Sequence, residues 1–253
     1  MIVGKKVRYD LAVISYIDIL GFRNLIETKS AGEISRVVRK LKERTKPDKE
    51  ESRYHGMKFF NFSDTAIRIT PVINPKSEHS RGNLFWELLA LVHVQYLLIL
   101  EKIIVRGAVS IGEIVKSWGV VYGPGLVSAY ETEQRASSPR IIVDPAVFKH
   151  LRMNPALWVH DYTEEHKGVM NLLCKDEDGK LFIDYLRSIE SEMDTPEVHY
   201  PRFIRTHADL IAEGLIRYRL NRDVVRKFKW LQKYHNSTVR NRFGKGVNRT
   251  LLV

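Results

Sequence analysis

Apolar residues recur along the first half of the chain with two different spacings. Four segments have the apolar, β-branched or aromatic composition and the length of a strand: residues 11–19, 57–62, 65–72 and 103–115. Two segments carry apolar residues at helical spacing: residues 31–45 and 83–102. The order strand, helix, strand, strand, helix, strand is that of a ferredoxin-like βαββαβ fold with an antiparallel sheet. The pattern therefore predicts the α+β class.

Shorter elements alternate in the second half of the chain. We predict helices over residues 127–136, 145–151 and 200–234, and strands over residues 139–143, 157–162, 169–174 and 181–185. The sequence DEDG at residues 176–179 predicts a hairpin turn between the last two strands. Polar segments predict loops at residues 46–52, 74–82 and 118–125, the last of them a loop or hairpin, and a poorly ordered end from residue 236.

These elements suggest two parts. We expect a catalytic core over residues 8–150 and an extension over residues 151–253, formed by additional strands in a β-hairpin and by basic helices packed on the core. The length of 253 residues is sufficient for one sizeable core with such an appendage.

The composition is typical of a globular protein, with 44% hydrophobic and 28% charged residues. The single cysteine, Cys174, excludes an intrachain disulfide and favours a reducing compartment. Residues 84–100 are the most apolar stretch, but Glu87, His93 and Gln95 interrupt it, which indicates a buried helix. The first ten residues contain no apolar signal core. We therefore expect a cytoplasmic protein without a membrane-spanning segment.

Positive charge is concentrated at the end of the chain. The formal net charge is +11, and from residue 201 onward there are thirteen Lys or Arg residues against three Asp or Glu residues. Such a tail can bind nucleic acid or an anionic surface, or it can be a solvated helical face that guides an anionic substrate. Core-type residues within the tail favour the second interpretation, so nucleic acid is not an expected partner.

Two aspartates occupy related positions in the predicted sheet. In a ferredoxin-like order the first and third strands are antiparallel neighbours, so Asp18 near the end of one meets Asp64 at the start of the other. Two adjacent carboxylates repel unless a cation joins them, and oxygen ligands suit Mg²⁺ or Mn²⁺. We predict a two-ion metal site at Asp18, Ile19 and Asp64, with both aspartates catalytic.

The residues around these aspartates are candidates for binding substrate. Leu20, Gly21 and Phe22 form a strand-to-helix turn whose main-chain N–H groups can cradle a triphosphate. Four further substrate-binding positions are predicted nearby: Phe60, Ser63, Thr65 and Arg106. The alternative is that Asp18 only caps a helix and that Asp64 only belongs to a Ser-Asp turn.

Several short motifs resemble those of class III nucleotide cyclases. Residues 17–22 (IDILGF) resemble the first metal motif of that family, and residues 62–65 (FSDT) correspond to its second metal aspartate. Residues 106–113 (RGAVSIGE) resemble its next strand, and residues 122–131 (YGPGLVSAYE) its dimer-lining loop and helix. The resemblance covers about residues 8–150. It implies a homodimer with shared active sites, in which a ribose 3′-hydroxyl attacks the α-phosphate and pyrophosphate leaves.

The chain departs from the family at the base-binding and transition-state positions. Purine cyclases usually have a lysine four residues before the second aspartate, where this chain has Phe60. The transition-state Asn and Arg of the family fall at about Val127 and Glu131. An aromatic side chain can stack on a smaller base, and Arg106, beginning the strand antiparallel to the first, can donate to a pyrimidine carbonyl or a phosphate.

These features resemble the bacterial pyrimidine cyclases of the Pycsar antiphage system, which produce cyclic UMP or cyclic CMP as a second messenger. The resemblance implies UTP as substrate, with CTP less favoured, although no residue decides between uracil and cytosine. Two alternatives remain open. One is another class III-like cyclase acting on ATP or GTP, and the other is a non-catalytic nucleotide- or nucleic-acid-binding module.

No other catalytic motif is found in the sequence. The glycine patterns of a nucleophile elbow, a Walker loop and a Rossmann turn do not occur. The histidines of the second half have no metal-ligand spacing with Cys174, which is expected to be a buried small hydrophobe.

Overall fold

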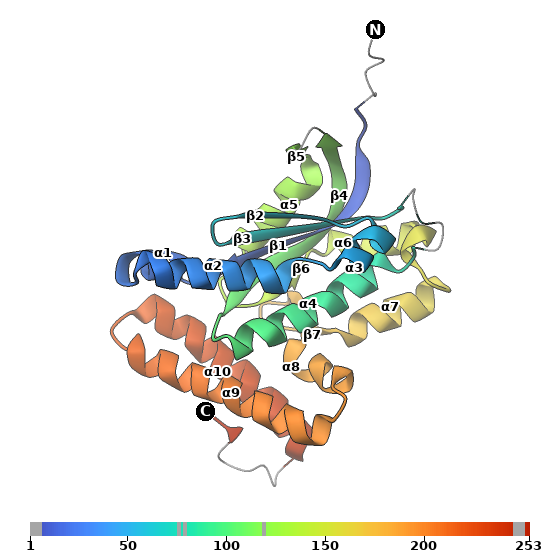
Figure 1. Cartoon of the computed structure of the whole chain (residues 1–253). Helices are drawn as coiled ribbons and strands as arrows, with labels where there is room; N and C mark the ends of the chain where they lie inside the picture. The colour runs from blue at the N-terminus through green and yellow to red at the C-terminus, as the bar shows by residue number, and fades with distance from the viewer. Residues whose placement is uncertain (1–6, 75–76, 78–79, 118–119, 245–250) are drawn as a thin grey trace.

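A mixed sheet forms the centre of the protein (Figure 1), and strand β1 lies near its middle. The computed structural model describes residues 7–74, 77, 80–117, 120–244 and 251–253. The strands are β1 (Asp10–Ile19), β2 (Lys58–Phe62), β3 (Thr65–Pro71), β4 (Val105–Ser117), β5 (Val120–Tyr122), β6 (Ile141–Val143), β7 (Leu173–Lys175) and β8 (Leu181–Ile183). Their order is β2-β3-β1-β4-β6-β8-β7, and β5 pairs with β4 outside this path.

The helices are α1 (Phe22–Thr28), α2 (Ala31–Thr45), α3 (Lys49–His55), α4 (Asn83–Leu100), α5 (Pro124–Gln134), α6 (Ala146–Met153), α7 (Tyr162–Asn171), α8 (Tyr185–Ser188), α9 (Pro196–Arg217) and α10 (Arg222–Phe243). Two 3-10 turns, η1 (Pro155–Leu157) and η2 (Ile189–Glu192), complete the described elements. The antiparallel order β2-β3-β1-β4 with α1 and α2 after β1 and α4 after β3 confirms the predicted α+β, ferredoxin-like core.

The two faces of β1 pack against different helices. Val13, Ile17 and Ile19 join the large core that includes residues of α4, whereas Ala12 and Ile14 join a smaller cluster with Ala129 of α5. This alternation follows from the two-residue period of a strand. Asp18 therefore lies on the α5 face of the sheet.

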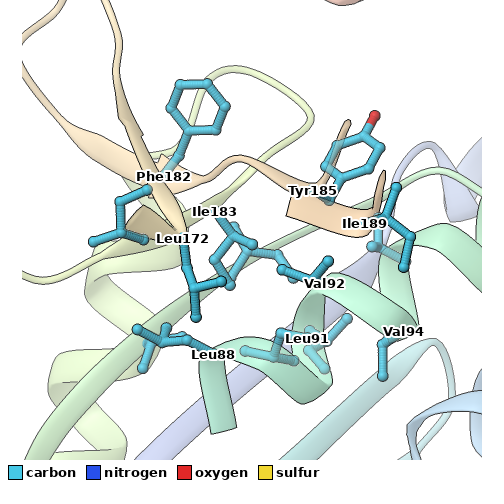
Figure 2. Close-up of a cluster of buried hydrophobic side chains, with 14 of the residues drawn as sticks. Leu88, Leu91, Val92, Val94, Leu172, Phe182, Ile183, Tyr185 and Ile189 are labelled. Carbon is cyan, nitrogen blue, oxygen red and sulfur yellow. The ribbon is translucent and has the colours of Figure 1, made fainter. Parts of the chain in front are cut away.

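The segments after residue 150 are continuous with the core. Strands β8 and β7 extend the same sheet beyond β6, and the predicted hairpin turn between them is confirmed. Figure 2 shows Leu88, Leu91 and Val92 of α4 packed with Ile183 and Tyr185, which lie far along the chain. In Figure 1 the α9–α10 pair covers the lower side of the molecule. The division at about residue 150 stays a prediction.

Helix α4 is the one helix in the described residues that is long and apolar enough to cross a membrane. Of the 18 residues of this helix, 56% are buried inside the protein. Leu84, Leu88 and Leu91 on this helix are fully buried in the large core. Helix α4 is therefore a helix of the protein core in this structure.

Five sequence predictions about elements were wrong. Residues 49–52, predicted as part of a loop, belong to α3, because Asp48 accepts a hydrogen bond from the Glu51 main-chain N–H and caps this helix. Residues 157–162 are a turn and loop, and much of 169–174 belongs to α7, whose apolar residues face the core at helical spacing. The segment 200–234 contains two helices, since Asn221 caps α10. Helix α10 also continues past residue 236 to Phe243.

Parts of three predictions concern residues outside those described. They are residues 75–76 and 78–79 of the loop at 74–82, residues 118–119 of the loop or hairpin at 118–125, and residues 245–250 of the chain end. The described remainder of the second segment forms a hairpin, since β5 pairs antiparallel with β4.

A network of buried polar groups joins α4 to the sheet. Arg68 of β3 is 2% exposed and donates from Nε to Glu87 Oε1 at 2.9 Å. Ser15 Oγ of β1 donates to the same carboxylate oxygen at 2.7 Å. Arg68 also bonds the Thr45 carbonyl and the Glu51 carboxylate, at 2.7 and 2.9 Å. Glu87 is thus the acceptor around which β1, β3 and α4 meet.

Two buried histidines connect α9 and α10. His207 Nε2 lies 2.7 Å from the Tyr185 hydroxyl, and His207 Nδ1 lies 3.0 Å from His235 Nδ1. His235 Nε2 is 2.7 Å from the Leu251 carbonyl oxygen, so it must donate there. Burial favours the neutral form of both rings. In that form His235 Nδ1 accepts from His207, and His207 Nε2 accepts from Tyr185.

We predict that this pair makes the fold sensitive to acid. Burial lowers the pKa of both histidines, most strongly that of His207. The unfolded chain therefore binds more protons than the folded chain once the pH falls below about 6.5, so stability is lost in that direction. Asp18, whose pKa is raised to about 7, takes up a proton in the same range and acts in the opposite direction. Urea unfolding of an Asp18→Asn background, which removes this contribution, should show a loss of roughly 1 to 3 kcal/mol between pH 7.5 and pH 5.5.

The matched variant is His207→Gln, which removes one titrating group. In the same Asp18→Asn background, its unfolding free energy should change less between the two pH values than that of the protein that keeps His207. An equal pH dependence in the variant would contradict the assignment to His207.

Candidate metal and nucleotide site

The two predicted aspartates meet at the end of β1. Asp18 is directly opposite Thr65 on β3 and Arg106 on β4. Asp64 lies in the two-residue turn before Thr65, and the Ile19 main-chain N–H donates to its carbonyl oxygen at 3.2 Å. The antiparallel pairing on both sides of β1 thus sets the positions of both carboxylates.

Asp18 is electrostatically destabilised as a carboxylate. Burial and the neighbouring charge of Asp64 raise the pKa of Asp18 to about 7, although Arg106 acts in the opposite direction. Thr65 Oγ1 donates to Asp18 Oδ1 at 3.4 Å. The positive charge of Arg106 is therefore insufficient to offset the two carboxylates and their burial.

Arg106 connects Asp18 to a third carboxylate. Its Nε and Nη2 donate to Asp18 Oδ2 at 3.3 and 3.2 Å, and Nε also lies 2.8 Å from Glu133 Oε1. Glu133 of α5 is 1% exposed, and burial raises its pKa. Sequence reasoning missed Glu133. The available signal was its position four residues after Ala129, on the buried face of the predicted helix.

Close backbone contact positions the helix that carries Glu133. A Cβ atom added to Gly112 of β4 would lie 2.5 Å from the Cα of Gly125 on α5. Such an approach is possible only because both residues are glycines. Helix α5 therefore lies directly on the sheet, which brings Glu133 to Arg106.

Some of the main-chain N–H groups in the turn after β1 are already hydrogen-bonded within the protein. The Leu20 N–H donates to the Ile104 carbonyl at 2.9 Å, and Gly21 has φ +78° with open space where a Cβ would point. Phe22 packs against the large core. Helix α1 has no side-chain cap, so Asp18 is not a capping residue. The remaining N–H groups of this turn are those of Gly21 and Phe22.

The other predicted substrate-binding residues lie around the same strand ends. Phe60 packs with Tyr16 and Ile67 in the smaller cluster, on the sheet face that carries Asp18. Ser63 is exposed in the turn and has φ 54°, the left-handed region. Asp64 does belong to a Ser-Asp turn, as the alternative interpretation expected, but this turn also places it beside Asp18.

The donor set fits a hard divalent cation. Within the described ranges no group of three or more His, Cys, Asp or Glu residues is arranged to hold a metal, so the protein offers a pair of carboxylates. Mg²⁺ is commonly bound by one or two carboxylates, with water and substrate phosphates completing its shell. A cation between Asp18 and Asp64 would also relieve the repulsion that raises the pKa of Asp18.

No protein-family model matches the sequence, and no curated protein matches it either. Several solved structures have a similar fold, and three of them are nucleotide cyclases of different kinds. The adenylyl cyclase CyaB from P. aeruginosa has 11% identity and a TM-score of 0.48, covering 71% of this chain and 95% of its own. A bacterial light-regulated adenylyl cyclase has 13% identity and a TM-score of 0.43, covering 56% and 79%.

The third similar structure is the catalytic core of a rhodopsin-guanylyl cyclase with converted specificity in complex with ATPαS. It has 12% identity and a TM-score of 0.43, covering 59% of this chain and 85% of its own. At these values of identity and TM-score the neighbours assign no substrate and no reaction to this chain.

Proposed function

We propose that this chain is a class III-like nucleotide cyclase that converts UTP, or less favourably CTP, into the 3′,5′-cyclic nucleotide and pyrophosphate. The observation that carries the proposal is the partly buried Asp18–Asp64 pair with Arg106 beside it. Two carboxylates that repel in the absence of a cation are costly to retain at the end of a central strand. A bound cation gives them a function.

Each residue of the site has a role in this proposal. Asp18 and Asp64, with the adjoining Ile19, hold two Mg²⁺ or Mn²⁺ ions, which supply charge neutralisation at the phosphates and activation of the 3′-hydroxyl. Gly21 and Phe22 offer main-chain N–H groups to the phosphates. In the reaction the 3′-oxygen forms a bond to the α-phosphorus, the bond from the α-phosphorus to the oxygen that bridges to the β-phosphate breaks, pyrophosphate leaves with that oxygen, and the 3′-hydroxyl proton passes to water.

Arg106 holds one metal-binding carboxylate in place. Its guanidinium is shared between Asp18 and Glu133, so it keeps the Asp18 oxygens oriented before a cation binds. Another N–H group of the planar Arg106 guanidinium would donate to a phosphate or to a base carbonyl of the substrate.

The pyrimidine assignment depends on Phe60. This side chain packs with Tyr16 and Ile67 on the face that carries Asp18, where an aromatic ring can stack on a base. Phe60 occupies the position at which purine cyclases usually have a base-binding lysine. A smaller base leaves room for the ring.

Exposed apolar side chains support a homodimer with shared sites. Val120 and Tyr122 of β5 and Val127 and Tyr130 of α5 are between 48% and 57% exposed. Apolar groups gathered on consecutive elements are typical of a surface that pairs with another chain. We include in the proposal a cytoplasmic location and a role of the cyclic product as an antiphage signal.

The experiment is to incubate the pure protein with Mn²⁺ or Mg²⁺ and each of the four nucleoside triphosphates separately. Chromatography and mass spectrometry then identify the product. A cyclic product with pyrophosphate from UTP or CTP alone supports the proposal, whereas product from ATP or GTP supports the purine alternative. The absence of product from every triphosphate, together with unchanged nucleotide binding in Asp18→Ala, would overturn both the reaction and the metal site.

A further inference from the structure

A cavity of about 250 Å³ lies behind the turn that follows β1. Leu20 and Gly21 form one side of it, and residues of α9 and α10 form the other. The interior is mainly apolar, with Ile103 and Phe228 among its lining residues, and charged side chains stand around it. The C-terminal helices therefore reach the same turn that we propose to bind phosphate.

Two cations that line this cavity, Lys227 of α10 and Arg217 of α9, have no carboxylate partner among the described residues, and Lys227 is the half-buried one of the two. Lys102 donates to Glu213 at 2.7 Å, and Glu101 accepts from Arg44 at 3.0 Å, so both carboxylates of the cavity are engaged. Within the described part of the chain, Lys227 forms no hydrogen bond and no ion pair within 4.0 Å. The free ammonium is thus available to an anion.

The immediate surroundings of Lys227 are also positive. Asp223, one turn earlier on α10, pairs with Arg226 at 3.1 Å. Burial and then the positive charges of Arg106 and Arg226 lower the pKa of Lys227, and the nearby carboxylate of Asp223 acts in the opposite direction. Arg106 in turn donates to Asp18, so Lys227 is within electrostatic reach of the residues at the metal site. Two cations held this close are stabilised when an anion binds near both.

We infer that Lys227 binds the polyphosphate of the substrate, and that the packing of the basic C-terminal helices positions its ammonium group near the turn at Leu20 and Gly21. The inference rests on the proposed function for the identity of the polyphosphate. Asp18 and Asp64 approach the turn from the α5 face of the sheet, and Lys227 approaches it from the α9–α10 side. A nucleoside triphosphate lying at the turn is then contacted from both sides.

The test compares Lys227→Ala, Lys227→Arg and Lys229→Ala. Lys229 is a matched control because it is an exposed lysine on the same helix and does not line this cavity. Loss of a charge-assisted contact made in both ground and transition states should raise KM for the triphosphate roughly tenfold to a hundredfold with little change in kcat. The inhibition constant of pyrophosphate should rise in parallel, and Lys227→Arg should restore most of both.

Two outcomes separate this inference from the proposed function. If the wild type is active but Lys227→Ala has the KM and the pyrophosphate inhibition of Lys229→Ala, the inference is wrong and the cyclase proposal stands. If the wild type forms no product, titration calorimetry with tripolyphosphate and Mn²⁺ decides. A tenfold or greater weakening in Lys227→Ala but not in Lys229→Ala supports the site without the reaction, and equal binding in all variants overturns it.

Discussion

Replacing Asp18 or Asp64 by asparagine is expected to lower the rate of nucleotide cyclisation by roughly a thousandfold or more. Metal-bound charge stabilisation contributes several kcal/mol to such a transition state, and each 1.36 kcal/mol corresponds to a factor of ten in rate. Asparagine keeps the size and most hydrogen bonds of the side chain but removes the negative charge that binds the cation. The measurement is the initial rate at saturating Mn²⁺, with Asp209→Asn, an exposed residue of α9, as the control.

The same substitution at Asp18 should have an opposite effect on stability. In the metal-free protein the charged Asp18 is disfavoured by burial and by Asp64, so its neutral amide should unfold at a higher denaturant concentration than the wild type. Loss of activity with retained or increased stability excludes misfolding as the cause. Wild-type turnover in both the Asp18→Asn and the Asp64→Asn variant would refute the metal assignment.

Replacing Glu87 by alanine should cost roughly 3 to 5 kcal/mol of unfolding free energy. Glu87 accepts from both Arg68 and Ser15 in the interior, and its removal leaves the guanidinium of Arg68, which is 2% exposed, without its most buried counter-charge. Glu51 retains a contact to Arg68 from a more exposed position, and it offsets only part of this loss. Urea unfolding at neutral pH measures the effect.

The control is Glu43→Ala, which breaks an exposed pair with Arg39 at 3.7 Å. Exposed pairs contribute little, so this variant should change stability by less than about 1 kcal/mol. The double variant Arg68→Met with Glu87→Leu should recover much of the loss, because paired removal leaves no buried charge. A loss below about 1 kcal/mol for Glu87→Ala would show that Arg68 is adequately compensated without it.

The strand order and the meeting of Asp18 with Asp64 were both accessible from the sequence. Alternating apolar positions define which strands exist, and the ferredoxin-like order makes the first and third strands neighbours. The exact register comes from the structure, in which Asp18 is opposite Thr65. A shift by one residue would turn Asp18 into the core and Ile17 out of it.

Glu133 was not accessible in the same way. Its role depends on how deeply α5 rests on the sheet, which the contact between Gly112 and Gly125 determines. Two glycines of different elements carry no periodic signal that relates them. The sequence likewise does not distinguish Lys227 from the other basic residues of the C-terminal segment. Its position near the turn depends on how α9 and α10 pack.

The wrong predictions at α3 and α7 share a physical cause. Both helices are short, and each begins at an aspartate that caps it, Asp48 or Asp161, within a charged segment. The composition of residues 46–52 indicated a loop and the apolar residues in 169–174 indicated a strand, whereas the capping hydrogen bonds and tertiary packing decide in favour of a helix.

The pairing of Asp18 with Arg106 spans 88 residues of sequence, and this has a consequence during synthesis of the chain. The ribosome delivers Asp18 and Asp64 first, Arg106 about forty residues after Asp64, Glu133 later and Lys227 near the end. A nascent chain that has formed only β1 to β3 therefore has both repelling carboxylates but no guanidinium to compensate them. In such a chain, dissolved Mg²⁺ is the counter-charge at hand, so the ion that we assign to catalysis would assist the first pairing of the strands before the enzyme is complete.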